Sequence, residues 1–367
     1  MNESFHQFCA LKNNDVRRKG QWREIYPMQP DGVHIWQDGV RYINFSSNDY
    51  LGIAATLRSK GGISVGAGAS RLVSGSRRLH NQIEATLAHM KNTQAALLFG
   101  SGYLANIGTI PALVGSGDIV LMDRLSHACM IDGVRLSGAQ LRRFQHNDME
   151  HLEALLRAHR PKARHCIILT ETIFSMDGDA APLDALSALA TQYDAWLMTD
   201  DAHGFGIVNH PNPALVQMGT LSKAAGCYGG YVCGSRSFID MLKNHARTVM
   251  FSTALSEVML HATADALQCI QEEPQRREQV KRHVEYLCDA FHLPRSPSAI
   301  VPFVLGDNDT VLRAHYHLKK CGVFVPAIRP PTVPKGTARL RICVNALHQQ
   351  EHLDELINAI KSFTRTC

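Results

Sequence analysis

The sequence predicts an α/β protein with a mostly parallel sheet, followed by a smaller α+β domain at the C-terminus. Short apolar runs alternate with helical patterns over residues 83–200, which indicates a sheet covered by helices on both faces. The apolar run 195–199 ends in Asp200 and, three residues later, His203. A buried parallel strand ends in this way when it presents polar groups at the carboxyl edge of its sheet. After residue 251 the alternation gives way to long helical stretches.

The elements before residue 200 are expected in regular alternation. A short helix comes first, then a small hairpin around Asp38–Gly39. We expect strands at 95–99, 119–122, 141–144, 165–170 and 195–200. We expect helices at 83–90, 152–156 and 183–193, and one more that follows the loop 100–103 and includes residue 106. In a parallel sheet, the residues that follow these strands lie at one common edge.

The C-terminal part is expected to form a separate, smaller unit. Helix 255–270 and the charged segment 272–282 precede three strands, at 300–305, 322–327 and 340–344, with helices between them. The segment 329–334 contains three prolines, which fix its course and suit a loop that presents side chains. We divide the chain into an N-terminal arm that packs with the small domain, a large domain and a small domain, at 1–45, 46–250 and 251–367.

Composition narrows the class of protein. The chain has 367 residues, with 38 Lys and Arg against 33 Asp and Glu, so its formal net charge is +5. This mild excess without a long basic block favours a small anionic ligand over nucleic acid. The ten cysteines include no Cys-x-x-Cys motif, which indicates free thiols in a reducing compartment. No leader pattern and no apolar run of about twenty residues is seen, so we expect a cytoplasmic protein without membrane contact.

The residues after the strands form a candidate site. They are Gly102, His127, Ser175, Asp200 and Lys223. Because these loops follow parallel strands, we expect them to meet in one crevice. A carboxylate at a strand end and a lysine on a later loop are what pyridoxal phosphate (PLP) chemistry requires: the amine bonds the cofactor, and the carboxylate keeps its pyridine nitrogen protonated. The Gly-Ser-Gly loop 100–102 before a helix could bind phosphate.

Each motif alone also has a simpler interpretation. Two adjacent acids at a strand end often form a turn or a helix cap, and a single loop lysine is usually solvated. Asp200 and His203 could bind a metal, but no third ligand lies at short spacing, so we expect no metal site. The glycine-rich stretch 66–76 matches neither the Walker A nor the dinucleotide pattern.

Five separated segments together resemble the α-oxoamine synthases, which are PLP-dependent transferases of fold type I. In chain order they are Phe45–Gly52, Leu125–Ala128, Phe174–Asp179, Asp200–Gly204 and Thr220–Lys223. The segments 327–334 and 336–341 are similar to the family branch that acts on alanine and a pimeloyl thioester. The resemblance covers nearly the whole chain and implies a mostly parallel seven-stranded sheet in the large domain.

The resemblance also implies roles for individual residues. Lys223 would carry PLP covalently and later move protons at the substrate α-carbon. Asp200 would pair with the pyridine nitrogen, His127 would stack on the ring and contact substrate, and His203 would contact the phenolic oxygen. The further cofactor contacts implied are Gly102, Tyr103, Ser175 and Thr220.

The substrate residues follow from the same resemblance. Asn48 and Arg341 match positions that hold the carboxylate of the amino acid, for which a bidentate arginine fork is well suited. Arg23 and Thr332 match positions in contact with the acyl substrate. Ser252–Thr253 would reach the phosphate of the other subunit, which implies a homodimer with its site at the subunit interface.

The implied reaction is the decarboxylative condensation of L-alanine with a pimeloyl thioester of CoA or of an acyl carrier protein, in biotin biosynthesis. One alternative is a sister enzyme with another pair of substrates, such as glycine and acetyl-CoA or a long-chain acyl donor. Another is a catalytically silent scaffold subunit, against which Lys223 and Asp200 argue. The chain is shorter than expected for the family at 52–66 and 203–220, which affects the expected lid and acyl fit but leaves the cofactor residues intact.

Overall fold

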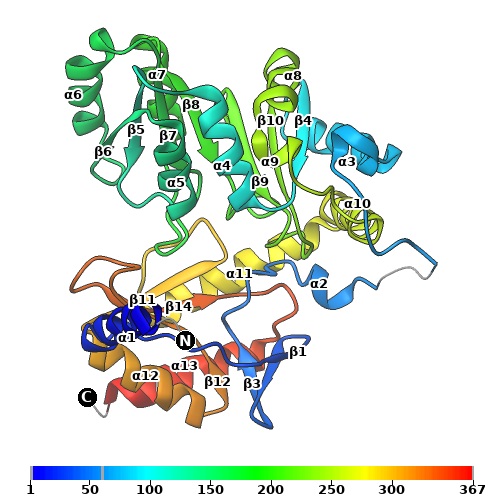
Figure 1. Cartoon of the computed structure of the whole chain (residues 1–367). Helices are drawn as coiled ribbons and strands as arrows, with labels where there is room; N and C mark the ends of the chain where they lie inside the picture. The colour runs from blue at the N-terminus through cyan, green and yellow to red at the C-terminus, as the bar shows by residue number, and fades with distance from the viewer. Residues whose placement is uncertain (1–2, 59–61, 366–367) are drawn as a thin grey trace.

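The structure is a computed structural model that describes residues 3–58 and 62–365. Its centre is a seven-stranded sheet in the order β4-β10-β9-β8-β7-β5-β6 (Figure 1). The strands are β4 (Ala95–Phe99), β5 (Ile119–Asp123), β6 (Gln140–Phe144), β7 (Cys166–Glu171), β8 (Trp196–Asp200), β9 (Val216–Thr220) and β10 (Gly230–Gly234). Only β10 runs antiparallel to its neighbours. The predicted mostly parallel sheet is therefore confirmed.

Helices cover both faces of this sheet, because alternate strand residues point to opposite sides. Leu97 and Phe99 pack into the core beneath α4 (Gly102–Leu113), α5 (Ala128–Ser137), α8 (Arg236–His245) and α9 (Arg247–Met250). Leu98 packs into the opposite core. The second face is covered by α3 (Arg78–Met90), α6 (Met149–His159), α7 (Leu183–Gln192) and α10 (Glu257–Glu272).

The C-terminal unit contains a three-stranded antiparallel sheet, in the order β11-β14-β13. Its elements are α11 (Pro274–Phe291), β11 (Ile300–Gly306), α12 (Asn308–Lys320), β13 (Ala327–Ile328), β14 (Ala338–Cys343) and α13 (Gln350–Arg365). A separate sheet joins β1 (Gln29–Asp31), β2 (His34–Gln37), β3 (Val40–Asn44) and β12 (Val323–Phe324). The parallel pairing of β3 with β12 links the start of the chain to its C-terminal part. The domain boundaries at 45 and 250 stay predictions.

The strand expected at 322–327 is in fact two strands in two different sheets. β12 pairs with β3, and β13 pairs with β14. Pro326 lies between them, and a proline has no N–H to donate to a ladder. The single-strand prediction was wrong because the apolar run hid this interruption.

Three short elements connect these layers. They are α2 (Ile53–Thr56), a π-helical turn at Arg71–Gly75 and a 3-10 turn at Arg160–Lys162. Part of the shortened segment 52–66 lies outside the described residues. Within the described part of the chain, no helix is both long and apolar enough to cross a membrane.

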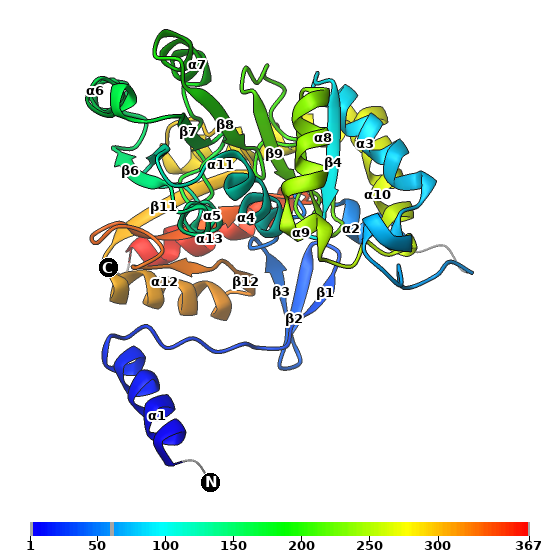
Figure 2. The ribbon, with the colours of Figure 1, turned by 45° about the horizontal axis from the view of Figure 1, so that its top comes forward.

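Helix α1 (Glu3–Arg18) extends away from the body of the protein (Figure 2). It has no buried residue, and its apolar side chains Phe5, Phe8 and Leu11 are all exposed. An amphipathic helix normally buries its apolar face against a neighbouring element. In the single chain this face has no cover.

Candidate functional site

Asp200 lies at the carboxyl end of β8 and is almost fully buried. Asn106 of α4 donates from Nδ2 to Asp200 Oδ2 over 2.9 Å, and the N–H of Ala202 donates to Oδ1 over 2.9 Å. Burial raises the pKa of Asp200, while the nearby Lys223 and these two donors oppose that rise. The carboxylate is therefore held in a fixed orientation at the sheet edge.

The adjacent Asp201 instead contacts side chains that stabilise the fold. Its Oδ2 lies 2.5 Å from the ammonium of Lys91, and the hydroxyl of Thr172 donates to its Oδ1. A Cβ on Gly204 would lie 2.2 Å from Asp201 Oδ1, so only glycine fits there. The two adjacent acids therefore differ. The carboxylate of Asp200 is oriented by amide N–H donors, whereas that of Asp201 forms an ion pair with Lys91.

Lys223 lies in the loop after β9, and its amine is buried beside an imidazole. Nζ is 2.8 Å from Nε2 of His203, and Nδ1 of that ring is 2.7 Å from the hydroxyl of Tyr50. Burial lowers the pKa of Lys223, although Asp200 and Glu171 oppose this shift. Burial and then the charge of Lys223 lower the pKa of His203. An amine with a depressed pKa can accept and return protons near neutral pH.

Arg341 of β14 completes this buried cluster. Its Nε donates to the backbone oxygen of Ser175 over 2.6 Å, its Nη1 to Oδ1 of Asn48 over 3.2 Å, and its Nη2 to the hydroxyl of Tyr50 over 3.4 Å. Among the described residues, it forms no ion pair with a carboxylate. A buried guanidinium without a counter-ion is a ready site for an anionic ligand. The structure thus brings Asn48 and Arg341 together, and their expected role in holding a carboxylate stays a prediction.

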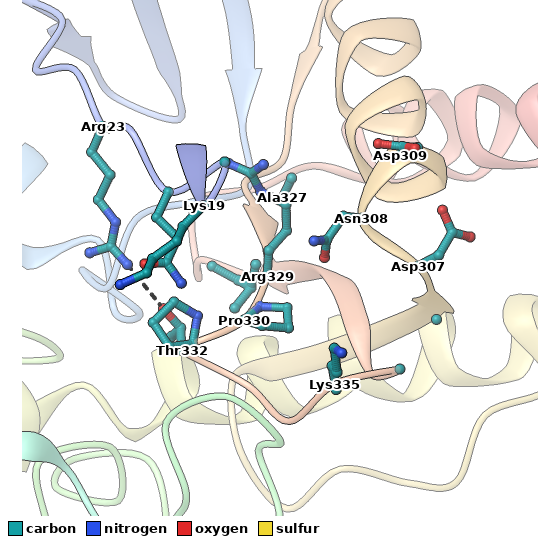
Figure 3. A pocket seen from close by; sticks show the side chains of 16 residues that line it. Lys19, Arg23, Asp307, Asn308, Asp309, Ala327, Arg329, Pro330, Thr332 and Lys335 are labelled. Atoms are coloured by element: carbon teal, nitrogen blue, oxygen red, sulfur yellow. Dashed lines mark hydrogen bonds between the residues drawn. The ribbon is translucent and has the colours of Figure 1, made fainter. Parts of the chain in front are cut away.

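His127 and Ser175 line a groove of about 840 Å³ beside this cluster. Arg23 and Thr332 lie along the same groove and also line a second one, of about 790 Å³. Nη2 of Arg23 donates to the hydroxyl of Thr332 over 3.4 Å (Figure 3). The second groove is also lined by the cations Lys19, Arg329 and Lys335 and by the acids Asp307 and Asp309 (Figure 3).

The N-terminus of α4 provides the candidate phosphate seat. Ser101 caps this helix by accepting from the N–H of Leu104, which leaves the N–H groups of Gly102 and Tyr103 at the helix end. A Cβ on Gly102 would lie 3.2 Å from Cβ of Thr220, so this loop packs closely on the end of β9. The hydroxyl of Thr220 donates to the backbone of Gly229, and that of Tyr103 donates to Asp132.

These groups fit PLP. An amine, a buried carboxylate, an imidazole and a helix N-terminus match the aldehyde, pyridine nitrogen, ring and phosphate of that cofactor. In addition, Glu171 Oε1 is buried without a hydrogen-bond partner among the described residues, which indicates an unfilled polar contact at the site. Burial, together with the charge of Asp200, raises the pKa of Glu171 to about 8. No group of three metal-ligating side chains was found in residues 3–58 and 62–365.

The loop that carries Ser175 is fixed by His146. Nδ1 of His146 lies 3.1 Å from Oδ1 of Asp123, and Nε2 lies 2.9 Å from Oδ2 of Asp179. Although burial of the ring opposes ionisation, hydrogen bonds to the two carboxylates raise the pKa of His146 to about 10. The imidazolium is therefore the folded-state form at neutral pH, and it joins the end of β5 to the 174–179 loop.

We expect His146→Gln to destabilise the protein most at low pH. Because the folded-state pKa is raised from 6.5 to about 10, the stabilisation is complete below about pH 6.5 and is lost as the pH rises through 10. The loss at pH 6 should be about 1.5–3 kcal/mol. Thermal midpoints of both proteins at pH 6 and pH 10.5 test this. A difference of the same size at both values would contradict it. His165→Gln is the control, since the imidazole of His165 stacks on Trp196 and has no carboxylate partner in the described part of the chain.

Four residues at the site were not assigned a role from sequence. They are Tyr50, Asn106, Cys129 and Glu171. Two of them could have been found from the sequence. Tyr50 lies inside the family-like segment Phe45–Gly52, and Glu171 is a polar residue at the end of an expected strand. Asn106 and Cys129 lie on helical stretches, where no local pattern distinguishes a site residue from a core residue. The positions of Ser252–Thr253 beside Ser70 are described, but their proposed contact with a second subunit stays a prediction.

The comparisons with known proteins agree with this geometry. The model of the family "Aminotransferase class I and II" matches residues 40–360. The 8-amino-7-oxononanoate synthase of Maricaulis maris is 44% identical, over 99% of this chain and 97% of that protein. The structure of Sphingomonas wittichii serine palmitoyltransferase has a TM-score of 0.89 at 24% identity, covering 99% of this chain and 98% of its own.

An 8-amino-7-oxononanoate synthase structure from Francisella tularensis has a TM-score of 0.74 at 24% identity, covering 89% of this chain and 98% of its own. Both structural matches have the same fold. The 44% identity to the M. maris protein is stronger evidence of family membership, because that alignment covers 99% of this chain, including every segment of the site. The chain therefore belongs to the class I and II aminotransferase family, among the 8-amino-7-oxononanoate synthases.

Proposed function

We propose that this protein condenses L-alanine with a pimeloyl thioester to give 8-amino-7-oxononanoate, CO2 and the free thiol carrier, in biotin biosynthesis. The observation that carries the proposal is the cluster in which the Lys223 amine, Asp200 and the Arg341 guanidinium meet, with no carboxylate paired to that guanidinium among the described residues. The name of the relative from M. maris supports the same reaction.

The cofactor of this reaction is PLP, held covalently by Lys223. When bound, PLP withdraws the negative charge that develops at the α-carbon of the amino acid. Asp200, whose carboxylate is oriented by Asn106, would keep a proton at the pyridine nitrogen. The α4 N-terminus and Thr220 would hold the phosphate, and His203 would contact the phenolic oxygen.

The protein side chains then bind and orient alanine. Arg341 and Asn48 hold its carboxylate, because the guanidinium has no carboxylate partner of its own among the described residues. Lys223 takes the α-proton and later returns one to the new α-carbon, a role for which a depressed pKa is needed. His203 keeps the amine within 2.8 Å of a neutral acceptor.

The groove of about 840 Å³ takes the acyl substrate. It runs from His127 to Arg23 and Thr332, so a thioester carbonyl at His127 would place the distal end of the acyl chain near a guanidinium. A pimeloyl chain ends in a carboxylate, which Arg23 can pair with.

The assay that tests the function offers three amino acids and three thioesters to the purified PLP-loaded protein. Alanine with pimeloyl-CoA should release CO2 and give 8-amino-7-oxononanoate by mass spectrometry, while glycine and serine should be poor substrates. Faster turnover of glycine with acetyl-CoA, or of serine with palmitoyl-CoA, would assign a sister activity. A protein that binds PLP but turns over no pair would be the silent scaffold.

We propose further that the protein is a homodimer, as the exposed apolar side chains support. Leu72, Val73, Tyr103, Tyr228 and Phe251 are all exposed in the single chain. Large apolar side chains that stay exposed in a single chain often become buried at a subunit interface. Ser252–Thr253 would then contact the phosphate held by the other subunit. A cytoplasmic location is proposed as well, since every cysteine among the described residues is free.

Mixed dimers test this arrangement. Lys223→Ala and Thr253→Asp should each be inactive alone, the second because a carboxylate repels phosphate. After subunit exchange, the mixed dimer contains one site with an intact Lys223 from one chain and an intact Thr253 from the other, so activity should return. A monomeric mass in light scattering, or no recovery in a verified mixed dimer, would contradict the shared site.

A further inference from the structure

The imidazole of His127 serves as the N-cap of helix α5. Its Nδ1 accepts a hydrogen bond from the backbone N–H of Cys129 over 3.3 Å. An N-cap side chain must offer a lone pair to the free N–H groups of the first turn. A nitrogen that accepts this bond cannot carry a proton of its own, so the cap favours the tautomer with its proton on the other ring nitrogen.

The thiol of Cys129 reaches the same nitrogen. Its Sγ lies 2.9 Å from His127 Nδ1, and the side chain is almost fully buried. Burial raises the pKa of the Cys129 thiol to about 12, so the S–H remains available as a donor. Two donors, one from the backbone and one from the side chain of Cys129, therefore converge on Nδ1.

Asn106 orients this thiol and links it to Asp200. One Nδ2 proton of Asn106 goes to Asp200 Oδ2 over 2.9 Å, and the other goes to Cys129 Sγ over 3.0 Å. Because the sulfur accepts from Asn106, its own proton is directed away from the amide and toward the imidazole. The bonds run in one direction, from Asn106 to Cys129 and from Cys129 to His127.

We propose that Cys129 is a positioning residue that holds His127 in the neutral tautomer with its proton on Nε2. Nε2 has no hydrogen-bond partner among the described residues, and the ring lines the groove of about 840 Å³. The Nε2–H of His127 is therefore available as a hydrogen-bond donor to a ligand in this groove. The tautomer does not depend on the proposed function, but its use does: in that reaction the Nε2–H would donate to the thioester carbonyl oxygen.

Long-range proton–nitrogen NMR of the holoenzyme labelled with ¹⁵N-histidine reads the tautomer directly. The His127 signal is assigned by its loss in His127→Gln. In the wild type, Nδ1 should show the shift of an unprotonated nitrogen and Nε2 that of a protonated one. Cys129→Ala should mix the two tautomers and lower kcat/KM by on the order of five- to tenfold, the effect of one lost hydrogen bond.

Two further variants separate positioning from packing. Cys129→Ser keeps a donor and should retain both the tautomer and kcat/KM within about twofold. Cys166→Ala removes a buried thiol from β7, outside the site, and should change neither reading.

A wild-type signal with the proton on Nδ1 would overturn the proposal. So would a Cys129→Ala variant with an unchanged tautomer. If the enzyme turns over no pimeloyl thioester, the proposed function fails while the tautomer is still decided by NMR. If it turns over normally and Cys129→Ala also lowers kcat/KM without any tautomer change, only the present proposal fails.

Discussion

Lys223→Ala is expected to lower kcat for the alanine–pimeloyl condensation by on the order of 10²–10⁴-fold, because it removes the only buried amine beside His203 among the described residues. The loss should fall on kcat more than on KM for alanine, since Arg341 and Asn48 remain in place. Steady-state kinetics measure this split. Borohydride reduction of the PLP-loaded wild type, followed by peptide mass spectrometry, should place the label on Lys223.

Lys223→Arg and Lys91→Met sharpen the test. Arginine keeps the positive charge but stays protonated, so this variant should be nearly as inactive as alanine if proton transfer is the role. Lys91 is a partly buried lysine that pairs with Asp201, away from the Lys223 amine. Its replacement should reduce thermal stability and leave kcat within a few-fold. An active Lys223→Arg variant would show that charge alone is required.

Asp200→Asn is expected to lower kcat by on the order of 10²–10³-fold, because it removes a fixed negative charge where positive charge must be stabilised. The side chain keeps its size, so the fold should be retained. Asn106 and the N–H of Ala202 donate to different oxygens of Asp200, so the single amide oxygen can keep one of these bonds, and thermal stability should fall slightly. PLP should still bind covalently, as the visible spectrum will show, but turnover should be slow.

Asp201→Asn is the matched control, since the two acids are adjacent in sequence. Its carboxylate faces Lys91 and Thr172, not the amine of Lys223. Breaking this buried pair leaves Lys91 without its partner, so thermal stability should fall. Turnover per folded enzyme should change little. Equal losses of kcat in the two variants would contradict the division of roles between them.

The arrangement of the sheet and much of the site could be predicted from the sequence. Buried parallel strands have long apolar runs, and each ends at the same edge, so Asp200 and Lys223 were placed in one crevice from their positions alone. The pairs Arg23–Thr332 and Asn48–Arg341 were found through the family resemblance. Each spans about 290 residues or more, and no local pattern reports such distant contacts.

The residues that were missed have a common physical cause. Cys129 and Asn106 sit on helices whose inward faces are also core, so their polarity gave no separate signal. Pro326 divides one apparent strand because two sheets meet there. One of these sheets is completed by β3, which lies near the start of the chain, and the other by β14, which follows soon after. Such features depend on tertiary contacts and not on local preference.

The pairing of β3 with β12 has a consequence for how the protein is made. β3 ends at Asn44, and its partner begins at Val323, so roughly 280 residues must leave the ribosome before the pair can form. At ordinary translation rates this delay is roughly 15–60 s. The hairpin β2–β3 therefore emerges with one edge exposed and waits while the seven-stranded sheet is completed. A chain that stalls before Val323 would keep that edge open, and such a nascent chain is a natural target for chaperones.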